Sequence, residues 1–123
     1  MLDFLAISLG AIVGANFRFV LSRYAARLSL AFPYGTLFIN VTGSFVLGFF
    51  LIWTTERVLA DPRWRLLVAV GFCGGFTTFS SYAFETMAYF EQGQWLLMTV
   101  NILANNLLCL GAVLAGMALA RVL

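Results

Sequence analysis

Three long segments of this chain contain no charged residue. No Asp, Glu, Lys or Arg lies between residues 28 and 55, between 66 and 84, or between 92 and 120. A helix needs about 20 apolar residues to cross the hydrocarbon core of a bilayer, and each segment approaches or exceeds that length. A fourth apolar segment, residues 4–21, contains a single charged residue, Arg18. The chain is therefore expected to be an all-α membrane protein with four spanning helices.

The composition excludes most other classes of protein. Of the 123 residues, 63% are hydrophobic and 10% are charged, and there is no His. Soluble domains carry roughly 25% charged residues, so this chain cannot cover a water-exposed surface. A soluble enzyme, a nucleic-acid binder and a disulfide scaffold are excluded. A Ser–His–Asp triad or a cluster of metal-binding side chains is not expected either.

We predict one membrane domain, residues 1–123, with helices at about 3–24, 33–55, 65–90 and 94–121. Both prolines fall in the connectors, and six of the seven Tyr and Trp residues lie at helix ends, at the headgroup level that they prefer. The N-terminus lacks the basic region of a cleavable signal peptide.

The arginines are divided almost evenly between the two sides of the membrane. Because four spans place both termini on one side, that side carries four arginines and the other carries two, or three if Arg18 reaches outward. This is a weak positive-inside bias, so insertion in either orientation is expected, with a single preferred topology as the alternative. The four are Arg57, Arg63, Arg65 and Arg121, and the two are Arg23 and Arg27.

Small residues recur every four positions in three of the helices. Such stripes allow close helix contacts in membranes, either within one four-helix bundle or between two chains. If chains insert both ways, an antiparallel homodimer with a two-fold axis in the membrane plane becomes natural. The stripes are Gly10 and Gly14, Ser44 and Gly48, and Ala112, Gly116 and Ala120.

The centre of the third span has a sequence unsuited to a helix. Two glycines, Gly74 and Gly75, are followed by the β-branched Thr77 and Thr78. We predict a helix break near residues 74–78, where freed carbonyls could hold a small cation and the next helix N-terminus could favour an anion. The alternative is an intact helix in which the glycines permit close packing.

Polar and aromatic side chains surround this predicted break. Phe79 and Tyr82 share a helix face, and their positive ring edges can contact an anion. Ser80 and Ser81 add hydroxyl donors. Core packing is the alternative for the aromatic pair, and bonds to the helix's own backbone are the alternative for the hydroxyls.

Amides lie deep in the second and fourth spans. Asn40 lies near the middle of its span, and Asn101, Asn105 and Cys109 form a stripe at four-residue spacing. A buried amide without a partner costs several kcal/mol, so these groups must pair across helices or line a polar path. Both alternatives stay open, with Asn40 able to donate two hydrogen bonds to a small anion.

Arg18 and Glu85 are the charged residues furthest inside their spans. Charges within a membrane indicate function by default. Arg18 could attract anions into a vestibule, or pair with Glu85 or with backbone carbonyls.

Three sequence blocks resemble the Fluc (CrcB) family of small fluoride channels, and the resemblance covers essentially the whole chain. The first is Gly10-xxx-Gly14-xxx-Arg18. The second, residues 35–45, is similar to the family's GTLxxNxxGS box, and the third, residues 71–80, to its GFxGGxTTFS signature.

The resemblance implies an antiparallel, dual-topology homodimer in the bacterial cytoplasmic membrane, with two pores for passive fluoride efflux that relieves toxicity. It implies that Asn40 and Phe79 line the pore. It also implies that the backbone carbonyls of Gly74 and Thr77 hold a structural Na⁺ at the dimer interface. The sequence departs from the family at Tyr82, where a Phe is usual, and in the fourth span, where hydroxyl groups are common.

Two other functions are considered. A small four-helix multidrug exporter has a similar length and dual topology. Its first span carries a glutamate, however, and the first span of this chain has none. A structural subunit without transport activity is the other, and the amide stripe argues against it.

Overall fold

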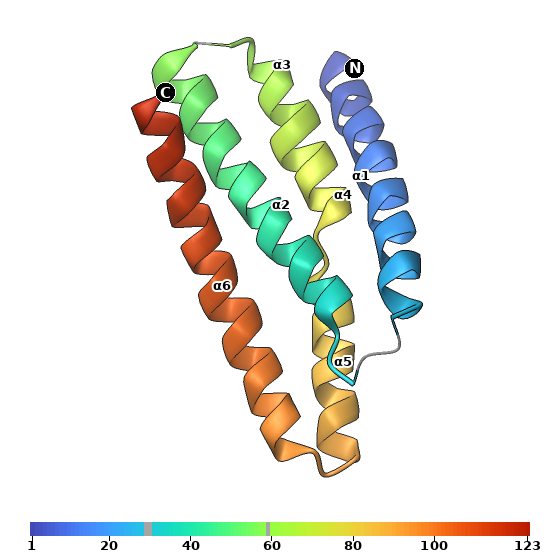
Figure 1. Ribbon diagram of the computed structural model, residues 1–123. Helices are drawn as coiled ribbons and strands as arrows, with labels where there is room; N and C mark the ends of the chain where they lie inside the picture. Colours follow the sequence, from blue (N-terminus) through green and yellow to red (C-terminus); the bar gives the residue numbers. More distant parts are fainter. Residues whose placement is uncertain (29–30, 59) are drawn as a thin grey trace.

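The computed structural model describes residues 1–28, 31–58 and 60–123, and all regular structure in these ranges is helical. Four helical segments are long and apolar enough to cross a membrane, so the chain has the predicted four spans. They comprise α1 (Leu2–Ala26); α2 (Tyr34–Ile52) with η1 (Trp53–Arg57); α3 (Pro62–Arg65), η2 (Leu66–Cys73), α4 (Gly74–Phe76) and α5 (Phe79–Glu91); and α6 (Trp95–Val122) (Figure 1).

The third span starts at a strong helix N-terminus. The side chain of Asp61 accepts a hydrogen bond from the backbone N–H of Arg63 at 2.8 Å, and Pro62 occupies the first helical position. Both features favour a helix start, because the cap satisfies a free N–H and proline has none to satisfy. From there the chain continues through the π-helical segment η2 into α4.

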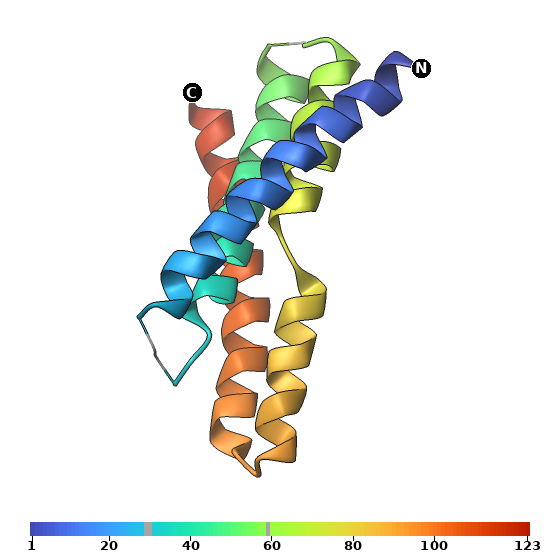
Figure 2. The same ribbon diagram turned by 90° about the vertical axis from the view of Figure 1, so that its right-hand side faces the viewer.

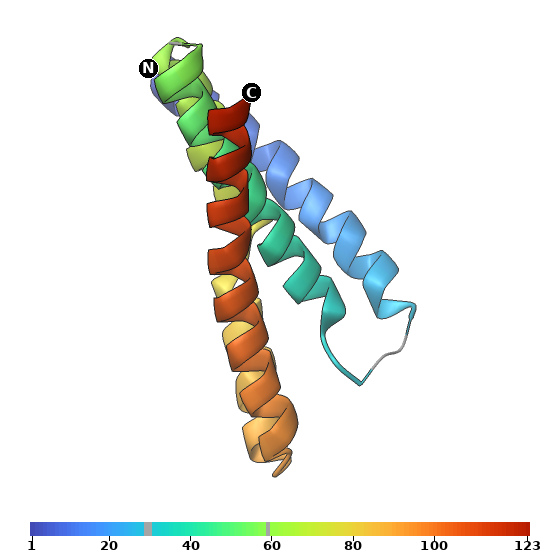
Figure 3. The same cartoon turned by 60° about the vertical axis from the view of Figure 1, so that its left-hand side comes forward.

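The spans form an elongated bundle with both termini at one end (Figure 1). α2 packs along α6, and α1 crosses η2 and α4 diagonally, as Figure 2 shows. At the opposite end α5 and α6 stay together, while α1 and α2 tilt away from them (Figure 3). The bundle is therefore tightly packed at the end with the termini and divided at the other.

Glycines bring α1 into backbone contact with the third span. A Cβ added to Gly10 or Gly14 would clash with backbone carbonyls of η2. A Cβ on Gly71 or Gly75 would lie 2.6 or 2.8 Å from carbonyl oxygens of α1. In the same way, Gly48 and Gly116 bring α2 and α6 together. These small residues pack within one chain, which is the first of the two alternatives drawn from the sequence.

Few apolar side chains are buried in the single chain. Among the described residues the buried hydrophobic core consists of Ile39, Cys73, Phe76 and Ala120. Large apolar side chains are exposed along all four spans, as expected for a surface that faces lipid or a second protein chain. Two ion pairs lie at the end with the termini, Arg63–Asp3 at 3.7 Å and Arg121–Glu56 at 3.4 Å.

Candidate functional site

The third span loses its helical backbone at two residues. α4 ends at Phe76, and α5 begins at Phe79. Between them Thr77 (φ −76°, ψ 156°) and Thr78 (φ −146°, ψ 109°) are extended, as the unwound segment in Figure 2 shows. Thr78 caps α5, since its Oγ1 accepts a hydrogen bond from the N–H of Ser81 at 3.2 Å.

Asn40 from α2 binds the extended segment on both sides of one residue. The backbone N–H of Thr78 donates to Asn40 Oδ1 at 2.8 Å, and Asn40 Nδ2 donates to the Thr78 carbonyl at 3.1 Å. The second hydrogen of Nδ2 goes to Asn105 Oδ1 at 3.2 Å. Backbone groups in a membrane must be satisfied inside the protein, and Asn40 does this where the helix cannot.

The amides of α6 continue this network away from Asn40. Asn105 Nδ2 donates to Asn101 Oδ1 at 2.9 Å, and Asn101 Nδ2 donates to Thr86 Oγ1 at 3.0 Å. Asn101 is fully buried and Asn105 is 5% exposed. The stripe therefore joins α6 to α2 and α5. Sequence reasoning missed Thr86, although it lies one turn after Tyr82 on the same helix.

A groove of about 380 Å³ lies beside the interruption. Its lining contains no charged residue, so an ion in it would meet only neutral groups. The rings of Phe79 and Tyr82 meet edge to face there, with centroids 5.3 Å apart at 69°, and Phe79 is 76% exposed. Seven predicted site residues line the groove, namely Asn40, Gly74, Thr77, Phe79, Tyr82, Asn105 and Cys109.

Two backbone carbonyls at the interruption are the groups that could hold a cation. In a continuous helix the carbonyls of Gly74 and Thr77 would accept from the N–H groups four residues later, those of Thr78 and Ser81. These N–H groups instead donate to Asn40 Oδ1 and to Thr78 Oγ1. Both carbonyls have therefore lost their helical donors. Apart from its chain neighbours and its own helix backbone, no atom of the described residues lies within 4 Å of a Cβ built on Gly74, so this side of the chain is open.

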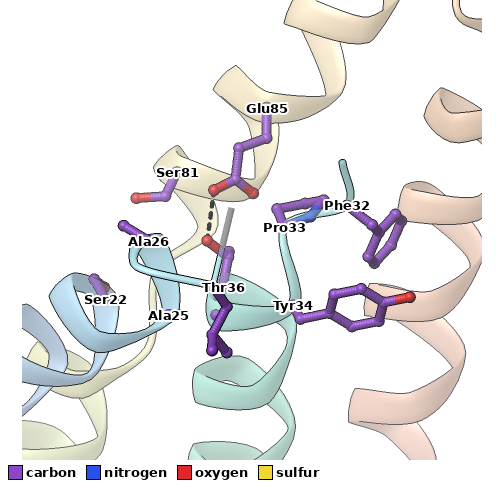
Figure 4. A pocket seen from close by; sticks show the side chains of 11 residues that line it. Ser22, Ala25, Ala26, Phe32, Pro33, Tyr34, Thr36, Ser81 and Glu85 are labelled. Atoms are coloured by element: carbon purple, nitrogen blue, oxygen red, sulfur yellow. Dashed lines mark hydrogen bonds between the residues drawn. The ribbon is translucent and has the colours of Figure 1, made fainter. Parts of the chain in front are cut away.

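Glu85 lies in a second pocket, of about 340 Å³, between the ends of α1, α2 and α5 (Figure 4). Thr36 Oγ1 donates to Glu85 Oε1 at 2.5 Å, while Glu85 Oε2 is buried and has no partner among the described residues. Ser81 lines this pocket and accepts a hydrogen bond from Thr78 Oγ1 at 3.0 Å, and Thr78 lines the groove. Thr36 was missed, although it lies one turn before Asn40.

The remaining predicted residues lie apart from the groove. Ser80 is exposed, with its Oγ 3.3 Å from Thr78 Oγ1. Arg18 is partly exposed on α1 and takes part in neither of the two ion pairs of the described residues. The single chain thus does not join Arg18 and Glu85.

Comparison with known proteins gives concordant matches. The family model of CrcB-like proteins, described as Camphor Resistance (CrcB), matches residues 5–117. A fluoride-specific ion channel FluC of Koribacter versatilis (strain Ellin345) is 62% identical over 97% of this chain and 95% of the relative. A relative of the same name from Roseiflexus sp. (strain RS-1) is 44% identical over 99% of this chain and 99% of its own length. Another, from Sulfurihydrogenibium sp. (strain YO3AOP1), is 43% identical over the full length of both chains, 100% of each.

Proposed function

The chain belongs to the CrcB family, and on that premise we propose that it is a fluoride-selective channel through which fluoride leaves the cell passively. It is a multi-pass bacterial membrane protein and not an enzyme. The observation that carries the proposal is the uncharged groove, where the Phe79–Tyr82 pair lies beside the interrupted span that Asn40 holds.

Fluoride is small and strongly hydrated, so a pore must replace its water shell. In the groove, ring edges of Phe79 and Tyr82 and nearby hydroxyls offer partial positive charge without a fixed cation. Several weak sites of this kind let an ion enter and also leave. Asn40 has both amide hydrogens bound to protein, so its first contribution is to hold the backbone of Thr78 in place.

We propose that the path continues on both sides of the aromatic pair. Asn105 and Cys109 lie along the groove, with Asn101 buried one turn beyond Asn105. On the other side, Ser80 and Ser81 would lead toward the pocket of Glu85, and Arg18 would draw anions to the mouth.

The pore would be completed by a second copy in the opposite orientation, giving two pores per homodimer. The groove is open in one chain, the ring of Phe79 is exposed, and no other segment of the described residues comes within 4 Å of the Cβ position of Gly74. We propose that the helix break faces its counterpart there. The carbonyls of Gly74 and Thr77, whose helical donors bond elsewhere, would hold a structural Na⁺ between the chains, where its charge offsets the carbonyl dipoles.

Fluoride efflux from proteoliposomes, followed with a fluoride electrode, tests the function. Asn40→Asp and Phe79→Ile are each expected to abolish efflux while the dimer still elutes intact from a sizing column. Phe84→Ile is the matched control, because Phe84 is as exposed as Phe79 on the same helix but lies outside the groove. Unchanged efflux in both pore variants would refute the pore.

The multidrug exporter is tested in the same vesicles. A proton-coupled exporter needs a titratable group in the membrane, and Glu85 is the carboxylate furthest inside the third span. If a pH gradient drove efflux of a cationic dye and the vesicles released no fluoride, the exporter would replace the channel as the proposed function.

A further inference from the structure

One hydrogen bond at the groove depends on the tyrosine that stands where the family usually has Phe. Asn106 Nδ2 on α6 lies 3.1 Å from the hydroxyl of Tyr82 on α5. The same nitrogen lies 2.8 Å from the backbone carbonyl of Ile102. Both side chains line the groove, so this bond is formed beside the proposed ion path.

The chemistry of these contacts fixes the direction of the bond. A carbonyl oxygen only accepts, so the Asn106 atom facing Ile102 must be the NH₂ nitrogen and not the amide oxygen. Since that nitrogen only donates, the Tyr82 oxygen must be the acceptor of the other N–H. The amide has then used both hydrogens, and the phenol keeps its own O–H proton.

Among the described residues, no acceptor receives the Tyr82 O–H. The phenol is held in place by the N–H that its oxygen accepts, and its own O–H is not used in a hydrogen bond. It can therefore donate this hydrogen bond from a fixed position. A hydrogen bond from O–H to an anion is charge-assisted and stronger than a contact to a ring edge. It favours the anion with the highest charge density, which among the halides is fluoride.

We propose that Asn106 is a positioning residue that makes Tyr82 an O–H donor to the permeating anion and so raises the preference for fluoride. The inference rests on the proposed channel function and adds to it a determinant of specificity. A Phe at position 82 could supply only the ring edge.

The test compares fluoride and chloride efflux for Tyr82→Phe, Asn106→Leu and the double variant in proteoliposomes. A hydrogen bond to a charged group contributes enough for about a tenfold effect. Tyr82→Phe is therefore expected to lower fluoride efflux about tenfold, with chloride leak unchanged. Asn106→Leu is expected to match it, and the double variant to lose no more than either single variant.

Asn16→Leu is the matched control. Asn16 makes the same bond to its own helix, from Nδ2 to the Ile12 carbonyl at 2.7 Å, but has no bond to another helix among the described residues. It is expected to conduct like the wild type. Because Tyr82→Phe conserves the ring, it stays informative even if Asn106→Leu assembles poorly.

The outcomes separate this inference from the channel itself. Wild-type vesicles that pass no fluoride would overturn both. Wild-type conduction with an equal rate in Tyr82→Phe would overturn only the hydroxyl donor. If Asn106→Leu still lowered efflux in the Tyr82→Phe background, Asn106 would act through packing and the positioning role would be wrong.

Discussion

The two halves of the third span are held by different forces. Its first half, from Pro62 to Phe76, lies against α1 with glycines at the contact, so that backbone meets backbone. Its second half, α5, is joined to α2 by the hydroxyl of Thr36, which donates to Glu85, and to α6 by the amide of Asn101, which donates to Thr86. The interruption at residues 77 and 78 separates the two.

This difference shows how a small membrane protein can combine a rigid frame with a polar path. Lipid provides no hydrophobic drive for helix association, so contacts need either close approach or hydrogen bonds. The glycine contact tolerates no added volume, but it is chemically inert. The amide contact must be satisfied group by group, and two of its amides, Asn40 and Asn105, border the groove. The size of a substituted side chain should therefore decide whether the first half still packs. Its hydrogen-bonding capacity should decide whether the second half does.

The largest expected effect comes from adding volume to the glycine contact. A Cβ at Gly14 would clash with the carbonyl of Phe72, and a backbone atom cannot rotate away. Gly14→Leu should cost at least the upper range of overpacking, about 3 kcal/mol. We expect little folded protein after extraction, measured as the yield of the symmetrical peak on a sizing column.

Gly111→Leu provides the control for this prediction. In the part of the chain that the structure describes, no other segment lies within 4 Å of a Cβ at Gly111 on α6, so the same substitution there should leave the yield near that of the wild type. Equal yields for the two variants would mean that the first half of the span is not limited by size.

Much of the fold followed from the placement of charge. Three uncharged segments and a fourth that contains only Arg18 indicated four spanning helices, and the described residues form four that are long and apolar enough. The three sequence blocks indicated the CrcB family, and the family model and the relatives agree. The length of these segments was sufficient to predict the helices, because a spanning helix must be apolar along its whole length.

The partners of the polar groups could not be predicted in the same way. A four-residue spacing places Asn101 and Asn105 on one face but does not say which helix that face meets. For the same reason Thr86 and Thr36 could not be predicted, because their hydrogen-bond partners lie 15 and 49 residues away in the chain. The glycine stripes were equally ambiguous, since close packing within a chain and between chains requires the same residues.

A smaller effect is expected from the buried end of the amide network. Asn101→Leu removes the donor to Thr86 and the side-chain acceptor for Asn105, whose Nδ2 keeps only the backbone carbonyl of residue 101, at 3.2 Å. Interhelical hydrogen bonds in membrane proteins contribute about 0.6 kcal/mol on average and about 1.7 kcal/mol at most. A double-mutant cycle with Thr86→Val, read as the free energy of unfolding in micelles, should give a coupling in that range. Additive effects would show that the Asn101–Thr86 bond does not stabilise the second half.

The smallest change, loss of one thiol, tests which wall of the groove is open to water. Both cysteines border the groove, but Cys73, in the packed first half, is 1% exposed, whereas Cys109 on α6 is partly exposed. A small methanethiosulfonate reagent should label Cys109 and slow fluoride efflux, and Cys109→Ala should make the channel resistant. Cys73→Ala is the matched control and should stay sensitive, because its thiol is covered by protein. If resistance followed Cys73→Ala instead, the packed half would be the one open to water, and the division between an inert frame and a polar path would be reversed.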